Sequence, residues 1–206
     1  LAVYGCLLGY TSIAAEMGDA DLKALVEHIA AESLPVVEDP GILSPRAFID
    51  EVLHERFPNP AIPDTPQRIA ADTSQKLPVR YGGTLRRYAR QSEQALAGLE
   101  FAPLVFAGWC RYLLGVDDRG NAMPVSPDPM LPQLQAHLKG IEVGRPDSLA
   151  GQLRAILSNA ALFGGDRYAA GLGERTEEMF RDMLAGPGAV PATEIRAGGG
   201  GTGTAG

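Results

Sequence analysis

Three charged side chains, Arg68, Asp72 and Lys76, follow one another at intervals of four residues. On one continuous helix this spacing places two cations on either side of a carboxylate along one face. Such a row is usually a set of exposed ion pairs, each worth roughly a few tenths of a kcal/mol. Two fixed cations can also grip hydroxyl or carboxylate oxygens of a polar substrate. Both interpretations stay open at this point, with Arg68 and Lys76 as candidate binding residues.

The three histidines, His28, His54 and His137, stand far apart in the sequence and have no cysteine or acidic partner at ligand spacing. Zinc and iron sites need such clusters, so we expect no metal site. His54 is expected to face solvent at the end of its helix. The acidic stretch 117–121 resembles part of a calcium loop but lacks the full ligand pattern, so a turn is expected there.

Motifs for cofactor phosphates and for nucleophilic catalysis are missing from the sequence. No GxGxxG run follows a strand, and the terminal glycines precede no helix. A phosphate cradle needs backbone N–H groups at the start of a helix, so we expect no cofactor-binding residue in this chain. There is no nucleophile elbow either, and no catalytic residue is expected.

The composition fits one soluble helical domain. The 206 residues are 45% hydrophobic, and the net charge of -7 disfavours nucleic acids and anionic membranes as partners. Cys6 and Cys110 lie among apolar neighbours and are expected to be free core residues, as in the cytoplasm. No apolar run reaches the roughly 18 residues of a membrane span. The chain begins with leucine, which indicates a fragment with further residues upstream.

The spacing of apolar residues predicts helices and no strand of convincing length, so the expected fold class is all-α. The expected helices cover residues 1–17, 19–34, 44–57, 64–77, 84–94, 95–114, 131–139, 148–158 and 174–184. The stretch 95–114 is the most apolar and is expected to form the central buried helix or helix pair, divided by Pro103. Residues 1–185 are expected to form the helical domain, and the Gly-rich residues 186–206 a disordered tail.

Three stretches resemble the mannitol dehydrogenase family of polyol-specific long-chain dehydrogenases. They are LAVYGCLLGY at 1–10, RFPNPAIPDTPQRIAADTSQKLPVRY at 56–81 and WCRYLLGVDDRG at 109–120. Ser126, Asp128 and Pro129 agree with the same family. The resemblance implies an all-helical C-terminal domain of the 6-phosphogluconate dehydrogenase C-terminal-like type, preceded by a Rossmann domain that is absent from this chain.

The resemblance also implies a function. In the family, hydride passes between a polyol or sugar acid and NAD or NADP without a metal, and a lysine acts as general base. That lysine and an Asn-x-x-His motif belong to the stretch before Leu1, outside this chain. Arg68 and Lys76 match the substrate-contacting cations. Some mannitol-oxidising members carry a histidine where this sequence has Ala71, so mannitol, arabinitol, sorbitol and fructuronate types all remain open.

Three functional hypotheses follow, of which the third is a different two-domain dehydrogenase with a similar helical domain, as in the 6-phosphogluconate dehydrogenase type. In the first, the chain is the substrate-binding half of a zinc-independent dehydrogenase, its partners are a polyol or sugar acid and its own N-terminal Rossmann domain, and it is inactive alone. In the second, the chain is a non-catalytic helical interaction module that retains only the fold. Residues upstream of Leu1 decide between them.

Overall fold

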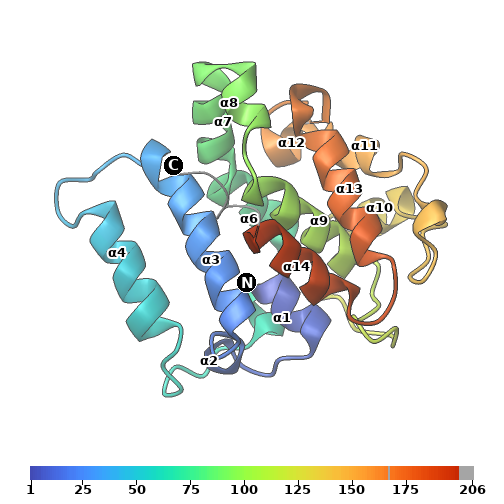
Figure 1. Cartoon of the computed structure of the whole chain (residues 1–206), viewed down its shortest axis with the longest axis horizontal. Coiled ribbons are helices and arrows are strands. Elements are labelled where there is room, and N and C mark those ends of the chain that lie inside the picture. Colours follow the sequence, from blue (N-terminus) through green and yellow to red (C-terminus); the bar gives the residue numbers. More distant parts are fainter. Residues whose placement is uncertain (167, 200–206) are drawn as a thin grey trace.

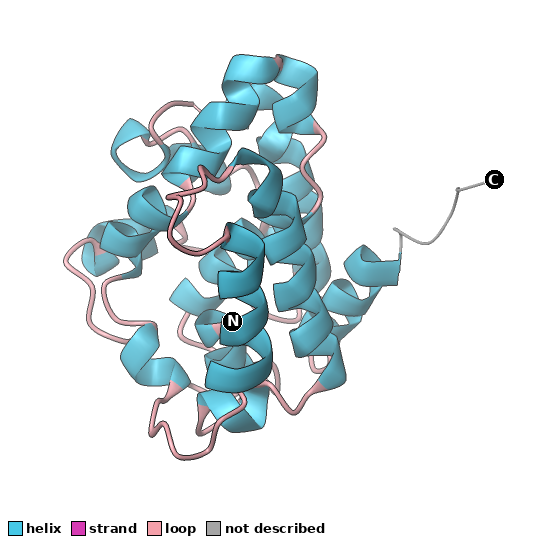
Figure 2. Ribbon diagram, turned by 90° about the vertical axis from the view of Figure 1, so that its left-hand side faces the viewer, coloured by secondary structure: helices cyan, strands magenta, loops and turns pink. Residues whose placement is uncertain are grey.

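The computed structural model describes residues 1–166 and 168–199. Within these ranges, the pairings of strand type are two isolated bridges, Val116 with Ala122 and Glu142 with Arg145. Helices provide the rest of the regular structure, and Figure 2 shows them joined by loops. The prediction of an all-α fold is confirmed. None of the described helices is long and apolar enough to cross a membrane.

The helices of the first half of the chain are α1 (Ala2–Leu8), α2 (Ile13–Glu16), α3 (Ala20–Ser33), η1 (Leu34–Val36), α4 (Pro45–Glu51), η2 (Val52–Arg56), α5 (Pro66–Ile69), α6 (Thr73–Arg80), α7 (Gly82–Gln91) and α8 (Glu93–Ala97). Those of the second half are α9 (Phe101–Leu113), α10 (Leu131–His137), η3 (Pro146–Ser148), α11 (Leu153–Leu157), α12 (Ala160–Phe163), η4 (Tyr168–Leu172), α13 (Gly173–Met183) and α14 (Ala189–Gly199). Among these, η1 and η3 are single 3₁₀ turns and η2 and η4 are π-helical turns.

Side-chain caps start several helices where the sequence predicts them. Asp19 Oδ1 accepts hydrogen bonds from the backbone N–H of Asp21 at 2.9 Å and of Leu22 at 3.3 Å, which begins α3. Ser44 and Thr65 cap α4 and α5, and each is followed by a proline in the first turn. These caps satisfy N–H groups that have no partner inside a helix.

The buried centre of the molecule is α9, which packs against α13, α1, α3 and α14 and is surrounded by them in Figure 1. Trp109 and Phe106 both make edge-to-face contacts with Phe163 of α12. Pro103 lies in the first turn, where a missing N–H costs no helical hydrogen bond. It therefore does not divide the helix, contrary to our expectation. Cys6 and Cys110 are free and buried, as predicted.

Two predicted helices are interrupted. The stretch 1–17 divides into α1 and α2 because Gly9 ends α1 in a left-handed conformation, with φ of 81°. The stretch 64–77 divides into α5 and α6 because Asp72 has φ of 54° and donates its N–H to Pro127 O at 2.9 Å. The prediction of one continuous helix through Arg68, Asp72 and Lys76 is therefore wrong. Pro78 lies inside α6, which continues past it to Arg80.

The prediction of a disordered tail from residue 186 is wrong for residues 189–199, which form α14. The helix packs against α3, α13 and α9. Its buried residues are Val190, Thr193 and Glu194. Their spacing of three and four residues gives the helix one face that contacts the body, so the glycine-rich composition on either side does not prevent folding. Residues 200–206 lie outside the described residues.

Candidate functional site

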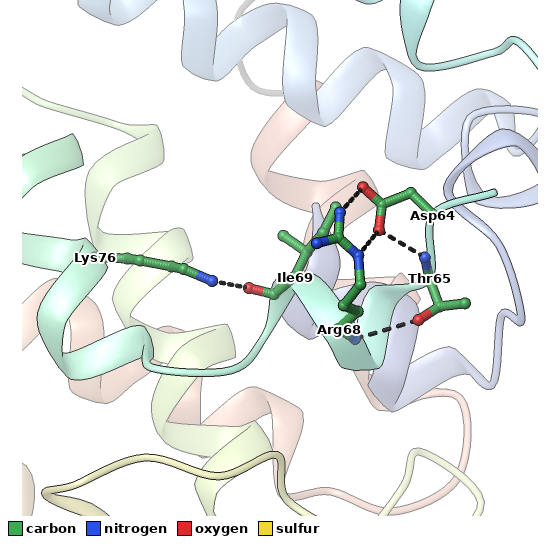
Figure 3. Close-up of polar contacts among 5 residues, drawn as sticks. All are labelled: Asp64, Thr65, Arg68, Ile69 and Lys76. Carbon is green, nitrogen blue, oxygen red and sulfur yellow. Dashed lines mark hydrogen bonds and ion pairs between the residues drawn. The ribbon is translucent and has the colours of Figure 1, made fainter. Parts of the chain in front are cut away.

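The two candidate cations lie on either side of the interruption between α5 and α6. Arg68 projects from the single turn of α5, and Lys76 projects from the first turns of α6. Figure 3 shows the amino group of Lys76 directed toward Ile69 at the end of α5, next to Arg68 on the same helix. The two residues therefore border one surface segment, although they do not share one helical face.

Asp64 is the carboxylate that pairs with Arg68 (Figure 3). Arg68 Nε donates to Asp64 Oδ1 at 2.7 Å, and Arg68 Nη2 donates to Asp64 Oδ2 at 2.5 Å. The hydrogen bonds from Arg68 and from the Thr65 N–H, together with the charges of Arg68 and Lys76, hold the pKa of Asp64 below its usual value. The expectation that Asp72 stands between the two cations is wrong: Arg68 pairs with Asp64, and Lys76 bonds to a backbone carbonyl.

Lys76 is half-buried and is fixed at its tip. Its Nζ donates to the carbonyl oxygen of Ile69, the last residue of α5, at 2.7 Å. This bond uses one of the three N–H donors of the ammonium group, so two remain. The two N–H groups of Arg68 Nη1 take no part in the pair with Asp64. Within the described residues, both cations thus retain donors that are not used by the protein itself.

The segment 126–128 fixes the backbone that carries both cations. Ser126 Oγ donates to Gln67 O at 2.7 Å, on α5. Asp128 accepts from Ser74 N at 2.7 Å and Ser74 Oγ at 2.6 Å, and it also accepts from Thr73 Oγ1 at 3.0 Å. These bonds join residues more than fifty positions apart in the sequence. They hold α5 and the start of α6 against one loop.

The surroundings of Asp128 favour its ionised form. Burial raises the pKa of this carboxyl, but hydrogen bonds from Ser74, Met130 and Thr73 outweigh burial and lower it. Trp109 of the core helix α9 donates its Nε1 hydrogen to Thr73 Oγ1 at 2.9 Å. The start of α6 is therefore tied both to the loop and to the most buried helix. The sequence alone assigns no role to Ser126 or Asp128.

The surface around Arg68 is open. Its side chain is 71% exposed. Two of the cavities formed by the described residues, of about 470 and 240 Å³, are lined by neither Arg68 nor Lys76. A small polar molecule held here would remain in contact with solvent unless a second surface covered it.

The other candidate residues do not join this segment. His28 stacks on Phe101, with ring centroids 4.8 Å apart, and His54 is exposed, as predicted. Asp117 accepts from Arg119 N and Asn121 N, which makes the stretch 117–121 a hydrogen-bonded turn, as predicted. No group of three or more histidine, cysteine or acidic residues in the described ranges is arranged to hold a metal ion.

Comparison with known proteins gives the family. Residues 1–171 match the model of the mannitol dehydrogenase C-terminal domain. The chain belongs to this family. It is 51% identical over 193 residues to D-mannonate oxidoreductase of Thermotoga maritima, covering 94% of the chain and 36% of that relative. It is 39% identical over 156 residues to mannitol 2-dehydrogenase of Emericella nidulans, covering 72% of the chain and 27% of the relative.

A solved structure supports the same membership of the mannitol dehydrogenase family. The ternary complex of Pseudomonas fluorescens mannitol 2-dehydrogenase with NAD and D-mannitol aligns with a TM-score of 0.72 at 26% sequence identity. The alignment covers 95% of this chain and 37% of that one. The chain thus spans about a third of the length of these relatives, and it corresponds to their helical C-terminal part.

Proposed function

We propose that the chain is the substrate-side domain of an NAD- or NADP-dependent dehydrogenase that interconverts a polyol or hexonate with its ketose or ketouronate. The family match over residues 1–171 carries this proposal. The relatives named above are a D-mannonate oxidoreductase and mannitol 2-dehydrogenases, and the solved one binds NAD and D-mannitol. The proposed domain includes residues 1–185 together with α14.

In this proposal Arg68 and Lys76 bind and orient the substrate. Their remaining N–H donors are available to hydroxyl or carboxylate oxygens, while Asp64 and the Ile69 carbonyl keep the two side chains in place. Because Asp64 already neutralises Arg68, Lys76 supplies the net positive charge for a sugar acid. Ala71, where some mannitol-oxidising members carry histidine, leaves more room and one polar contact fewer, which favours a substrate other than mannitol.

The nicotinamide cofactor would be held outside the described residues. A dinucleotide is normally bound at the edge of a parallel sheet, by a glycine-rich turn between a strand and a helix. The described residues contain helices and two isolated bridges, which do not fit this requirement. We therefore assign cofactor binding to a preceding Rossmann domain of a longer protein. We assign proton abstraction to the family's lysine in the stretch before Leu1. We place the protein in the cytoplasm and expect the 206-residue chain alone to be inactive.

The open surface around Arg68 supports a site between two domains. Hydride transfer requires the donor carbon and the nicotinamide at near-contact distance, with water excluded. The 71% exposed Arg68 side chain and the half-buried Lys76 form only one wall of such a site. A second domain placed over α5 and α6 would supply the other wall, the cofactor and the reacting groups.

The deciding experiment uses the complete reading frame that contains this chain. Purified protein is assayed with NAD and NADP against mannitol, arabinitol, sorbitol and mannonate, and with NADH and NADPH against fructuronate. We expect turnover of at least one substrate. Arg68→Ala and Lys76→Met should each raise KM at least tenfold, which corresponds to about 1.4 kcal/mol of binding free energy.

Arg46→Ala is the matched control, because Arg46 is also an exposed arginine, 73% exposed, in an i,i+4 pair with an aspartate. It should leave KM within twofold of the wild-type value. Turnover with unchanged KM in the Arg68 and Lys76 variants would remove the assigned binding role. A frame without a cofactor domain, and no turnover of any of these substrates, would favour the non-catalytic helical module instead.

A further inference from the structure

Two carboxyl groups, one on α2 and one on α14, are buried in the described part of the chain. Glu16 of α2 is 0% exposed and Glu194 of α14 is 4% exposed. The Glu16 carboxyl lies against the backbone of Gly5, yet none of the four carboxyl oxygens receives a well-formed hydrogen bond from the described residues. A buried carboxylate without partners is costly, so each must stay protonated or face a cation.

Both groups face the amino end of α1. The N-terminus of the chain lies between α3 and α14 in Figure 1. Burial raises the pKa of Glu16 and of Glu194, and the negative charge of Asp19 raises both further. Glu16 and Asp21 also raise the pKa of Glu194. The carboxyls therefore form one region of negative potential, in which added positive charge is stabilised.

A cavity opens beside this region between α3 and α14. It has a volume of about 240 Å³, and its acidic lining residues are Asp21 and Glu194. The rest of the lining includes Ala24, Leu25 and the stacked rings of His28 and Phe101. The cavity thus combines an acidic end with an apolar wall, which suits a cation on a short aliphatic stem.

We propose that this cavity binds an organic cation, an alkylammonium or alkylguanidinium group, whose charged end lies at Glu194 and Asp21 and whose stem lies on Leu25 and Phe101. Glu16 adds negative charge from further inside. A free amine and the side chain of a lysine or arginine in a polypeptide share this chemistry. Arg68 and Lys76 do not line the cavity, and the inference does not depend on the proposed dehydrogenase activity.

Several observations favour an organic cation over a metal ion. Calcium and magnesium take six or more oxygen ligands, and no group of three or more metal-ligating residues is arranged for them in residues 1–166 and 168–199. The Asp19 carboxylate is already used by Tyr10 Oη and by the N–H groups of Asp21 and Leu22. One monovalent cation suffices, because burial raises the pKa of Glu16 to about 7 and of Glu194 to about 8, so one of the two can remain protonated.

The test is calorimetric titration of the 206-residue chain with n-butylammonium and n-butylguanidinium chloride, at matched ionic strength and at pH 6 and pH 9. We expect saturable binding that is at least tenfold tighter at pH 9, because protons compete with the cation for the carboxyls. Butan-1-ol, which has the stem without the charge, should not bind. Binding of N-acetyl-lysine methylamide as tight as that of butylammonium would identify a polypeptide side chain as the ligand, and much weaker binding a free amine.

Variants locate the site. Glu194→Gln should weaken butylammonium binding at least tenfold and Glu16→Gln about threefold, whereas Glu93→Gln, which changes an exposed glutamate on α8, should have no effect. Circular dichroism establishes that each variant is folded. Should Glu194→Gln not fold, carbon-13 NMR of the glutamate carboxyls in the wild-type chain replaces it, with a butylammonium-dependent fall in the pKa of Glu194 as the expected result. Absence of saturable binding, equal binding by Glu194→Gln, or an unchanged Glu194 titration would overturn the proposal.

Discussion

Asp64 holds the Arg68 guanidinium through two parallel hydrogen bonds, of 2.7 Å from Nε and 2.5 Å from Nη2. This pair fixes a long and flexible side chain at an exposed position. An isolated surface ion pair of this kind contributes little to stability, typically about 0 to 1 kcal/mol. Its geometry nevertheless restricts the directions in which the remaining Arg68 donors point, which matters for a substrate that must be oriented.

The first prediction separates these two effects. Asp64→Asn should change the free energy of unfolding by less than about 1 kcal/mol, since the Arg68 side of the pair is exposed. The same change should raise the KM for the polyol or sugar acid several-fold in the complete enzyme. Urea unfolding and steady-state kinetics measure the two quantities. Asp50→Asn, which removes the exposed i,i+4 pair with Arg46, is the matched control and should change neither. An unaltered KM in Asp64→Asn would show that the pair does not position Arg68 for binding.

The second prediction concerns Asp128, which joins the start of α6 to the loop after α9. Asp128→Asn replaces one acceptor oxygen by an NH₂ group that faces N–H and O–H donors of Ser74, Thr73 or Met130. We expect a loss of about 1 to 3 kcal/mol in the free energy of unfolding, measured in urea. Asp147→Asn, at an exposed position, should change it by less than about 0.5 kcal/mol. Equal stabilities of the two variants would contradict the structural role of Asp128.

Local sequence signals account for the elements that the sequence predicts well. The Asp19 side chain caps α3, and Ser44 with Pro45 starts α4, because caps and first-turn prolines act within a few residues. The buried helix α9 follows from its apolar composition. The Asp64 to Arg68 spacing of four residues could also have been recognised, since an acid placed four positions before a base favours an ion pair on a helix.

Contacts between distant segments explain what the sequence did not predict. Asp72 leaves the helical conformation because two residues more than fifty positions later bind the backbone there: Pro127 O accepts from the Asp72 N–H, and the Asp128 carboxylate accepts from the Ser74 N–H. In α14, the buried residues Val190, Thr193 and Glu194 have helical spacing. The glycine and proline residues around them predict a disordered segment instead, so the sequence does not predict this helix. The contact of Lys76 with Ile69 likewise depends on the turn between α5 and α6, which a continuous helix would not form.

The third prediction uses the two buried glutamates. Their pKa values in the folded chain, about 7 for Glu16 and about 8 for Glu194, lie above the ordinary value of 4.5, chiefly because of burial. A carboxyl with a raised pKa binds its proton more tightly in the folded state, so its stabilising effect is complete below pH 4.5 and is lost as the pH rises through 7 to 8. The charged side chains that face them are Asp19 for both groups, and Asp21 for Glu194, which Glu16 also faces.

The free energy of unfolding should therefore fall by about 1 to 3 kcal/mol between pH 5 and pH 8.5, in buffers without organic amines. The double change Glu16→Gln and Glu194→Gln should remove most of this slope, because the amides do not titrate. Urea unfolding at four pH values measures the slope. A wild-type stability that stays constant or rises over this range would mean that both carboxyls are ionised and paired in the folded chain.

The fourth prediction tests the contact between α1 and the central helix. The Tyr4 ring packs directly on Gly108 of α9, and its Oη donates to Leu104 O at 2.7 Å. A Cβ at position 108 would overlap the ring, which is buried and held by that hydrogen bond. Gly108→Ala should therefore lower the free energy of unfolding by about 2 to 3 kcal/mol, although alanine is the better helix former.

Gly83→Ala separates packing from helix propensity. Gly83 is exposed in α7, and no atom lies within 4 Å of the position that a Cβ would take. This change should raise stability by up to about 1 kcal/mol, because only the propensity term acts there. If the Tyr4 contact controls the approach of α1 to α9, thermal or urea unfolding should show a lower free energy of unfolding for Gly108→Ala and a higher one for Gly83→Ala. Two stabilised variants would mean that Tyr4 can move aside at little cost, and that α1 is held mainly by its contacts with α5.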